Sequence, residues 1–140
     1  MVANLEMPKN LIWTLKLLDG GMILYWAIAA IACLGLITLP KELMYAGYGS
    51  AMVDAWNWSF APIDIAFSVM GLVAIWLAKK EDPRWQPVAL LSLALTFCAG
   101  LMAISYWILI GYYDLSWWLP NLALMAAALW WTPKLVAATR

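Results

Sequence analysis

The stretch Pro87–Ile110, PVALLSLALTFCAGLMAISYWILI, decides the fold class because it contains no charged residue. As an α-helix, a run of this length crosses the roughly 30 Å hydrocarbon core of a bilayer, which needs about 20 apolar residues. It also lacks the alternation of apolar and polar positions that a membrane β-barrel strand requires. The sequence therefore predicts a transmembrane helix over residues 87–110.

Three other apolar stretches predict helices over about residues 17–39, 61–78 and 115–136, the first ended by Pro40. Of the 140 residues, 66% are hydrophobic and 11% are charged, whereas about 25% are charged in an ordinary soluble domain. We therefore predict an all-α integral membrane protein, a four-transmembrane-helix bundle that forms a single membrane domain over residues 1–140. Residues 40–60 form its outer loop.

Basic residues predict the orientation of this bundle. Only Lys41 is predicted on one side of the membrane. The other basic residues are predicted on the opposite side: Lys9, Lys16, Lys79, Lys80, Arg84, Lys134 and Arg140. Basic residues are enriched on the cytoplasmic side of membrane proteins. Both termini are therefore predicted to be cytoplasmic.

Several kinds of chemistry find no support in the residues. The chain has no histidine, and its two cysteines, Cys33 and Cys98, form no CxxC motif, so we interpret them as buried small apolar residues. The sequence offers no metal-binding cluster, phosphate-binding loop or nucleophile–base pair. We therefore predict no catalytic residues, no metal and no cofactor, and the zero net charge gives no attraction to nucleic acid.

The stretch Trp56–Asp64, WNWSFAPID, places an acid at the start of the second predicted helix. If Ser59 caps this helix, Asp64 lies about one turn inside it, where the helix dipole stabilises a carboxylate. Alternatively, Asp64 faces the bundle interior above Ser68 and has a polar partner. Asn121 lies at the same depth on the fourth helix, so it is the predicted partner.

Aromatic residues are dense around this acid. The chain has 11 tryptophans, and an aromatic belt at the membrane interface explains many of them. The outer aromatics also suit the walls of a ligand site. The hypothetical ligand-binding residues are Asp64, Asn121, Trp58, Phe60, Trp107, Trp117 and Trp118.

Two other features concern the bundle interior. Asp19, followed by two glycines, is either a helix-start signal or an intrahelical acid neutralised by Lys16 or Lys134, and the sequence does not choose between them. The third predicted helix carries a ridge of small residues that suits close helix packing: Ser92, Thr96, Gly100 and Ala103.

Four strings of residues resemble the YvaD family of small bacterial membrane proteins: LLDGGMILYW, AWNWSFAPIDIAFSVMGL, LSLALTFCAGLMAISYWIL and DLSWWLPNL. The resemblance spans about residues 17–122. It implies a four-helix, multi-pass protein of the bacterial cytoplasmic membrane. It implies no activity and assigns no functional residues.

Our leading functional hypothesis is a non-enzymatic protein that binds a lipid, a small amphiphile or the transmembrane helix of a partner in the outer half of the bundle. The alternative is a small transporter or proton-coupled element that uses Asp64. Because four helices enclose little pathway, this alternative predicts a homodimer. A third hypothesis is a lipid-modifying enzyme.

Overall fold

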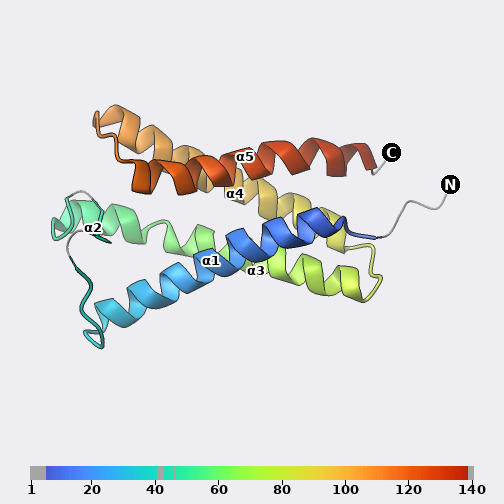
Figure 1. The fold of residues 1–140 in the computed structure, drawn as a ribbon, viewed down its shortest axis with the longest axis horizontal. Helices are drawn as coiled ribbons and strands as arrows, with labels where there is room; N and C mark the ends of the chain where they lie inside the picture. Colours follow the sequence, from blue (N-terminus) through green and yellow to red (C-terminus); the bar gives the residue numbers. More distant parts are fainter. Residues whose placement is uncertain (1–5, 41–42, 46, 139–140) are drawn as a thin grey trace.

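The computed structural model describes residues 6–40, 43–45 and 47–138, and this part of the chain is helical with no strand. Four long helices run up and down along one another, and a fifth, short helix lies at the end opposite the termini (Figure 1). The all-α, four-helix prediction is confirmed. The helices are α1 (Lys9–Cys33), α2 (Ala51–Trp58), α3 (Ala61–Lys79), α4 (Trp85–Leu109) and α5 (Leu115–Ala138).

Helix α1 begins and ends earlier than the predicted range 17–39. At its C-terminus, Gly35 adopts a φ of 73°, and the backbone N–H of Leu36 donates to the Ile31 carbonyl at 3.2 Å. This is the Schellman arrangement, in which a residue in the left-handed region closes the last turn. Gly35 therefore ends the helix, and Pro40 lies beyond it.

The predicted outer loop over residues 40–60 contains helix α2. Ser59 does not cap α3 as predicted, because its Oγ donates to the Trp56 carbonyl at 2.6 Å at the end of α2, and Phe60 occupies the position before α3. The Ser59 hydroxyl thus forms a hydrogen bond with the end of α2 instead of with the start of α3. The remaining helices, α3, α4 and α5, lie close to their predicted ranges.

The helices pack in the order α1, α3, α4, α5, with α3 and α4 in the middle. The backbones of α1 and α5 approach each other over a short stretch, where the indole N–H of Trp131 donates to Thr14 Oγ1 at 3.2 Å. Apolar residues such as Leu11 and Leu15 fill that end of the bundle. Toward the other end α1 and α5 diverge (Figure 1), and there the rings of Tyr25 and Trp117 make an edge-to-face contact at 6.5 Å.

Small residues of α4 allow its close contact with both neighbours. Ser92, Thr96 and Ala103 are buried as predicted, and Ser92 Oγ donates to the Phe67 carbonyl of α3 at 2.8 Å. A Cβ added at Gly100 would lie 2.8 Å from the backbone oxygen of Asn121 on α5. The ridge therefore packs two helices against α4, as the sequence predicts.

Three helical segments are long and apolar enough to cross a membrane: α1, the run Ala51–Lys79 that holds α2 and α3, and α4. Among the described residues α5 does not meet the same criterion, and it contains two prolines, Pro120 and Pro133, as well as the polar Asn121 and the charged Lys134. Three of the four long helices of the bundle, α1, α3 and α4, therefore lie in segments that meet the criterion for a membrane span.

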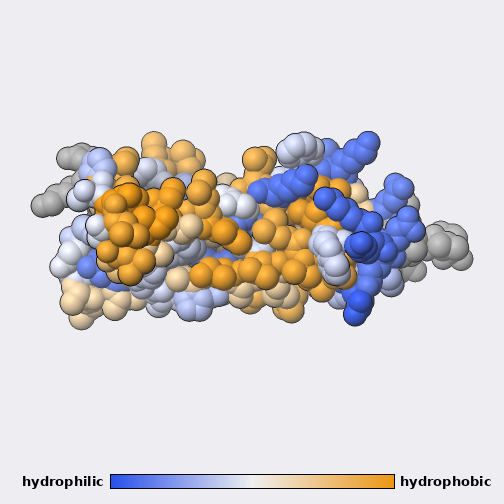
Figure 2. All heavy atoms as spheres, turned by 90° about the horizontal axis from the view of Figure 1, so that it is seen from below, coloured by the Kyte–Doolittle hydropathy of each residue, from blue (hydrophilic) through white to orange (hydrophobic). Residues whose placement is uncertain are grey.

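On the face seen in Figure 2 apolar residues cover much of the molecule, and hydrophilic residues gather toward the end that holds the α3–α4 turn. Cys33 and Cys98 are both free and exposed, so the prediction that they are buried is wrong. Both cysteines lie on helices whose exposed faces are largely apolar. Ile31 and Leu101 are examples of exposed apolar residues near them. A small apolar side chain is compatible with such a surface as well as with a core.

Substitution of Gly100 by alanine is expected to destabilise the bundle by about 1 to 3 kcal/mol, because the added carbon would push α4 away from the α5 backbone. Substitution of Gly20 by alanine is the matched control, since a Cβ there meets nothing within 4 Å and the gain in helix propensity is roughly 0.5–1 kcal/mol. Unfolding by sodium dodecyl sulfate in mixed micelles measures both. Equal stability of the two variants would contradict this packing.

Candidate functional site

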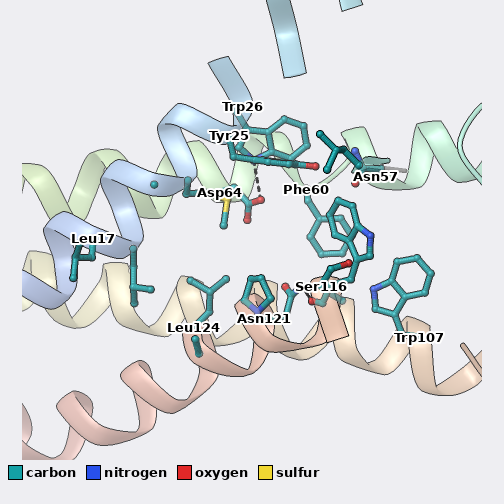
Figure 3. Close-up of a pocket in the computed structure, with 18 of the residues that line it drawn as sticks. Leu17, Tyr25, Trp26, Asn57, Phe60, Asp64, Trp107, Ser116, Asn121 and Leu124 are labelled. Carbon is teal, nitrogen blue, oxygen red and sulfur yellow. Dashed lines mark hydrogen bonds between the residues drawn. The ribbon is translucent and has the colours of Figure 1, made fainter. Parts of the chain in front are cut away.

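A cavity of about 480 Å³ lies in the half of the bundle where α1 and α5 diverge. All five helices contribute to its wall, and Figure 3 shows their side chains converging around Asp64. Its volume falls within the roughly 300–1,000 Å³ typical of small-molecule sites. Its aromatic wall consists of Tyr25, Trp26, Trp56, Phe60, Trp107 and Trp117.

Asp64 is buried, with 6% of its surface exposed, and it is the one charged residue among the described residues that line the cavity. Its Oδ2 accepts a hydrogen bond from the indole N–H of Trp26 at 2.9 Å (Figure 3). It lies in the first turn of α3 but makes no side-chain cap hydrogen bond. Asp64 is therefore directed toward α1 and the cavity rather than toward its own backbone.

Asn121 lines the same cavity but does not form the predicted hydrogen bond with Asp64. Its Nδ2 donates to the Trp117 carbonyl one turn earlier on α5, at 2.8 Å. The donor to Asp64 comes instead from Trp26, because α3 packs against α1 while α4 separates it from α5. The cavity thus has two polar groups on opposite walls rather than one bonded pair.

Of the other residues predicted for a ligand site, Phe60, Trp107 and Trp117 line the cavity. Trp58 and Trp118 do not. The Trp58 ring packs against Trp26 with 5.2 Å between centroids. The Trp118 indole N–H donates to the Tyr112 carbonyl at 3.2 Å, so this tryptophan of α5 binds the turn between α4 and α5.

The sequence reasoning missed the contribution of α1, above all Tyr25 and Trp26. The sequence does contain a signal, which is the helical spacing of Leu11, Leu15, Asp19 and Trp26 along one helix face. These four residues are the buried residues of α1. It also missed Asn57 of α2, toward which the Tyr25 hydroxyl points in Figure 3. No helix was expected there.

The segment between α1 and α2 covers part of the cavity. Leu43 contributes to the wall, and the Tyr45 ring lies 5.9 Å from that of Trp117 in an edge-to-face arrangement. The Tyr45 hydroxyl donates to Asp54 Oδ1 at 2.6 Å. Burial raises the pKa of this hydroxyl, and the nearby carboxylate of Asp54 adds to the effect, so Tyr45 remains a donor.

Asp19 is an intrahelical acid, because it lies within α1 and only 1% of its surface is exposed. The helix-start interpretation is therefore wrong. Neither proposed lysine neutralises it: Lys16 lies over the Trp13 ring at 5.0 Å, and Lys134 lies over the Trp130 ring at 3.4 Å.

The Asp19 carboxyl fits against Gly71 of α3, where a Cβ would overlap it. Its Oδ2 finds no hydrogen-bond partner among the described residues, and the same holds for the fully buried Oγ of Ser68. Ser68 lies between Asp64 and Gly71 on the buried face of α3. The interior thus carries two acids about two helical turns apart along α3, with a hydroxyl between them.

Three helical segments have the length and composition that cross a membrane, and the helices pack as a bundle with a largely aromatic cavity. These features define a small helical membrane protein. A family model described as "Family of unknown function (DUF5360)" matches residues 11–140, and the chain belongs to this family. It is 41% identical over 103 residues to "Uncharacterized protein YvaD" of Bacillus subtilis (strain 168), a region that covers 74% of each chain. The resemblance to the YvaD family is therefore confirmed. No solved structure matches.

Substitution of Gly71 by alanine is expected to destabilise the protein, because the new carbon overlaps the Asp19 carboxyl. In an Asp19→Ala background the overlap is removed, so the same change should be tolerated. We expect a coupling free energy of roughly 0.5–3 kcal/mol in this double-mutant cycle, measured by unfolding in mixed micelles. The cycle that combines Gly100→Ala with Asp19→Ala serves as the control and should be additive. Additivity in the first cycle would mean that the two groups do not touch.

Proposed function

We propose that this protein is a multi-pass protein of the bacterial cell membrane that binds a lipid or small amphiphile in the cavity beside Asp64. The observation that carries the proposal is the cavity itself. Had side chains filled this half of the bundle, Asp64 would have a purely structural role. Instead, an aromatic and apolar wall surrounds a few polar groups, which is the usual composition of a small-molecule site.

The distribution of charge supports the membrane arrangement, with both termini on the cytoplasmic side. The hydrophilic end in Figure 2 holds the described N-terminus, the described end of α5 and the α3–α4 turn. Basic residues concentrate on cytoplasmic segments. The set at this end is Lys9, Lys16, Lys79, Lys80, Arg84 and Lys134, while Lys41 and Arg140 lie outside the described residues. In this arrangement α5 is the fourth crossing, stabilised by its packing against α4.

The position of the cavity favours a ligand that comes from the bilayer. Leu17 lines the cavity and is 70% exposed, and on the facing helix Pro120 and Ala123 are both lining and exposed. These residues border the space between α1 and α5. In a membrane this space faces the hydrocarbon, so an amphiphile reaches the cavity sideways without crossing water.

The cavity offers little to an enzyme. Asp64 is the one carboxyl among the described lining residues, and these contain no histidine, lysine or cysteine that would pair with it for acid–base catalysis. Binding needs only shape, apolar contact and an orienting polar group. Binding is therefore the function that this geometry supports best.

Two adjacent glycines allow a direct test of the cavity. Gly21 lines it and Gly20 does not, while a Cβ added at either position meets nothing within 4 Å. Gly21→Leu is expected to fill the space and weaken amphiphile binding at least about tenfold, the equivalent of roughly 1.4 kcal/mol. Gly20→Leu should bind like the unaltered protein.

Binding is measured by isothermal titration calorimetry on protein in phosphatidylcholine nanodiscs, with single-chain phospholipids and decyl compounds as probes and empty nanodiscs as the blank. Both variants gain helix propensity, so a difference between them reports the cavity. Absence of binding by every probe to the unaltered protein would refute the proposed function. Equal binding by the two variants would place the ligand elsewhere.

A second function, a proton-coupled element that acts as a dimer, is favoured by the two interior acids. Asp19 has an unpartnered oxygen, and acids inside membrane bundles commonly serve proton relays. We expect liposomes that contain the protein to lose a pH gradient faster than empty ones, and Asp19→Asn to abolish the difference. A pyranine assay measures this, with Asp114→Asn as the matched control. No flux from a verified dimer would exclude this function.

A further inference from the structure

We propose that the ligand of this cavity is an organic ammonium compound with a hydrocarbon tail, held with its cationic group beside Asp64. This inference rests on the proposed function, because it names the chemical class of ligand for the same cavity. Three features carry it: the unbalanced charge of the cavity wall, the arrangement of the aromatic rings and the apolar end of the cavity at Leu17 and Leu124.

The charge of the wall favours a cation. Asp64 is the one charged side chain among the described lining residues, and its hydrogen bond comes from a neutral indole. A carboxylate in apolar surroundings is costly without a partner of opposite charge. A cationic ligand supplies this partner, a neutral ligand leaves the carboxylate uncompensated, and an anionic ligand meets repulsion.

The aromatic wall favours a cation of the ammonium type. The faces of tryptophan and tyrosine attract ammonium groups, and several rings together recognise quaternary ammonium. Trp56 is fixed for this role, because it stacks on Tyr106 with 3.7 Å between centroids and packs edge-on against Trp107 at 5.6 Å. Trp117 of α5 is a further part of the wall.

The other end of the cavity suits a hydrocarbon tail. In Figure 3 Leu17 and Leu124 lie on one side of Asp64, while Asn57, Ser116 and Trp107 lie on the other. The leucine side adjoins the opening between α1 and α5, where Leu17 is largely exposed. An ammonium group beside Asp64 therefore leaves room for an alkyl chain that runs past the leucines toward the bilayer.

The test compares three decyl compounds that differ in the charge of the head group: decyltrimethylammonium, uncharged decyldimethylphosphine oxide and decanoate. Binding to the full chain is measured by calorimetry in nanodiscs of digalactosyldiacylglycerol, an uncharged lipid without an ammonium group that could compete for the cavity, below the critical micelle concentration of each compound. We expect the ammonium compound to bind at least about tenfold more tightly than the phosphine oxide. Decanoate should bind most weakly.

Asp64→Asn is expected to bring the ammonium and phosphine oxide affinities within about twofold of each other, whereas Asp114→Asn, which removes a charge outside the cavity, should preserve the preference. Trp117→Leu keeps the carboxylate and should weaken the ammonium compound more than the phosphine oxide, which provides a second test if Asp64→Asn does not fold. Equal binding of the two compounds to the unaltered protein, or tighter binding of decanoate, would overturn the ammonium assignment while leaving amphiphile binding intact. Failure of all three compounds to bind would overturn the assignment together with the cavity as an amphiphile site.

Discussion

The packing of α1 against α3 is the constraint on which the rest of the structure depends. Two contacts of buried acids fix its register: Trp26 donates to Asp64 in the first turn of α3, and the Asp19 carboxyl fits against Gly71 near the middle of α3. The spacing along each helix is about two turns, so both contacts form in the same antiparallel alignment. A shift of one residue along either helix would break both at once and turn an acid toward lipid.

This register has a consequence for the shape of the bundle. It holds α1 against α3, while the small residues of α4 hold α5 on the far side. The two outer helices then approach closely near Thr14 and Trp131, while at the cavity end they meet through the edge-to-face contact of Tyr25 with Trp117 at 6.5 Å. A four-helix bundle with four equal seams would fill its interior, whereas this arrangement closes one end with apolar side chains and leaves a cavity at the other.

The sequence predicted the helices well because hydrocarbon thickness imposes a length and an apolar composition on each of them. It failed where local backbone geometry decides: Gly35 ends α1 before Pro40, and Ser59 bonds back to α2 instead of opening α3. The lining of the cavity was predicted in part. Asp64, Asn121 and three of the aromatic residues line one cavity, because residues at the same depth in one helical bundle converge.

The partners of those residues depended on which helices are neighbours, and hydropathy carries no information on that. Asn121 and Asp64 share a depth, yet α4 lies between their helices, so Trp26 of α1 is the donor. The state of Asp19 was equally undetermined, since a following pair of glycines suits a helix start and a helix interior alike. Burial in α1 decides between them.

Under the proposed function, the opening between α1 and α5 determines the phase from which the cavity takes its ligand, which is the bilayer. A ligand that arrives through a lateral opening equilibrates with the surrounding lipid, so occupancy follows its mole fraction in the membrane rather than its concentration in water. Weak intrinsic contacts then suffice for high occupancy of any compound that partitions strongly. Selectivity in such a site must come from groups that distinguish one membrane-dissolved compound from the many others, and among the described lining residues Asp64 is the charged group available for this role.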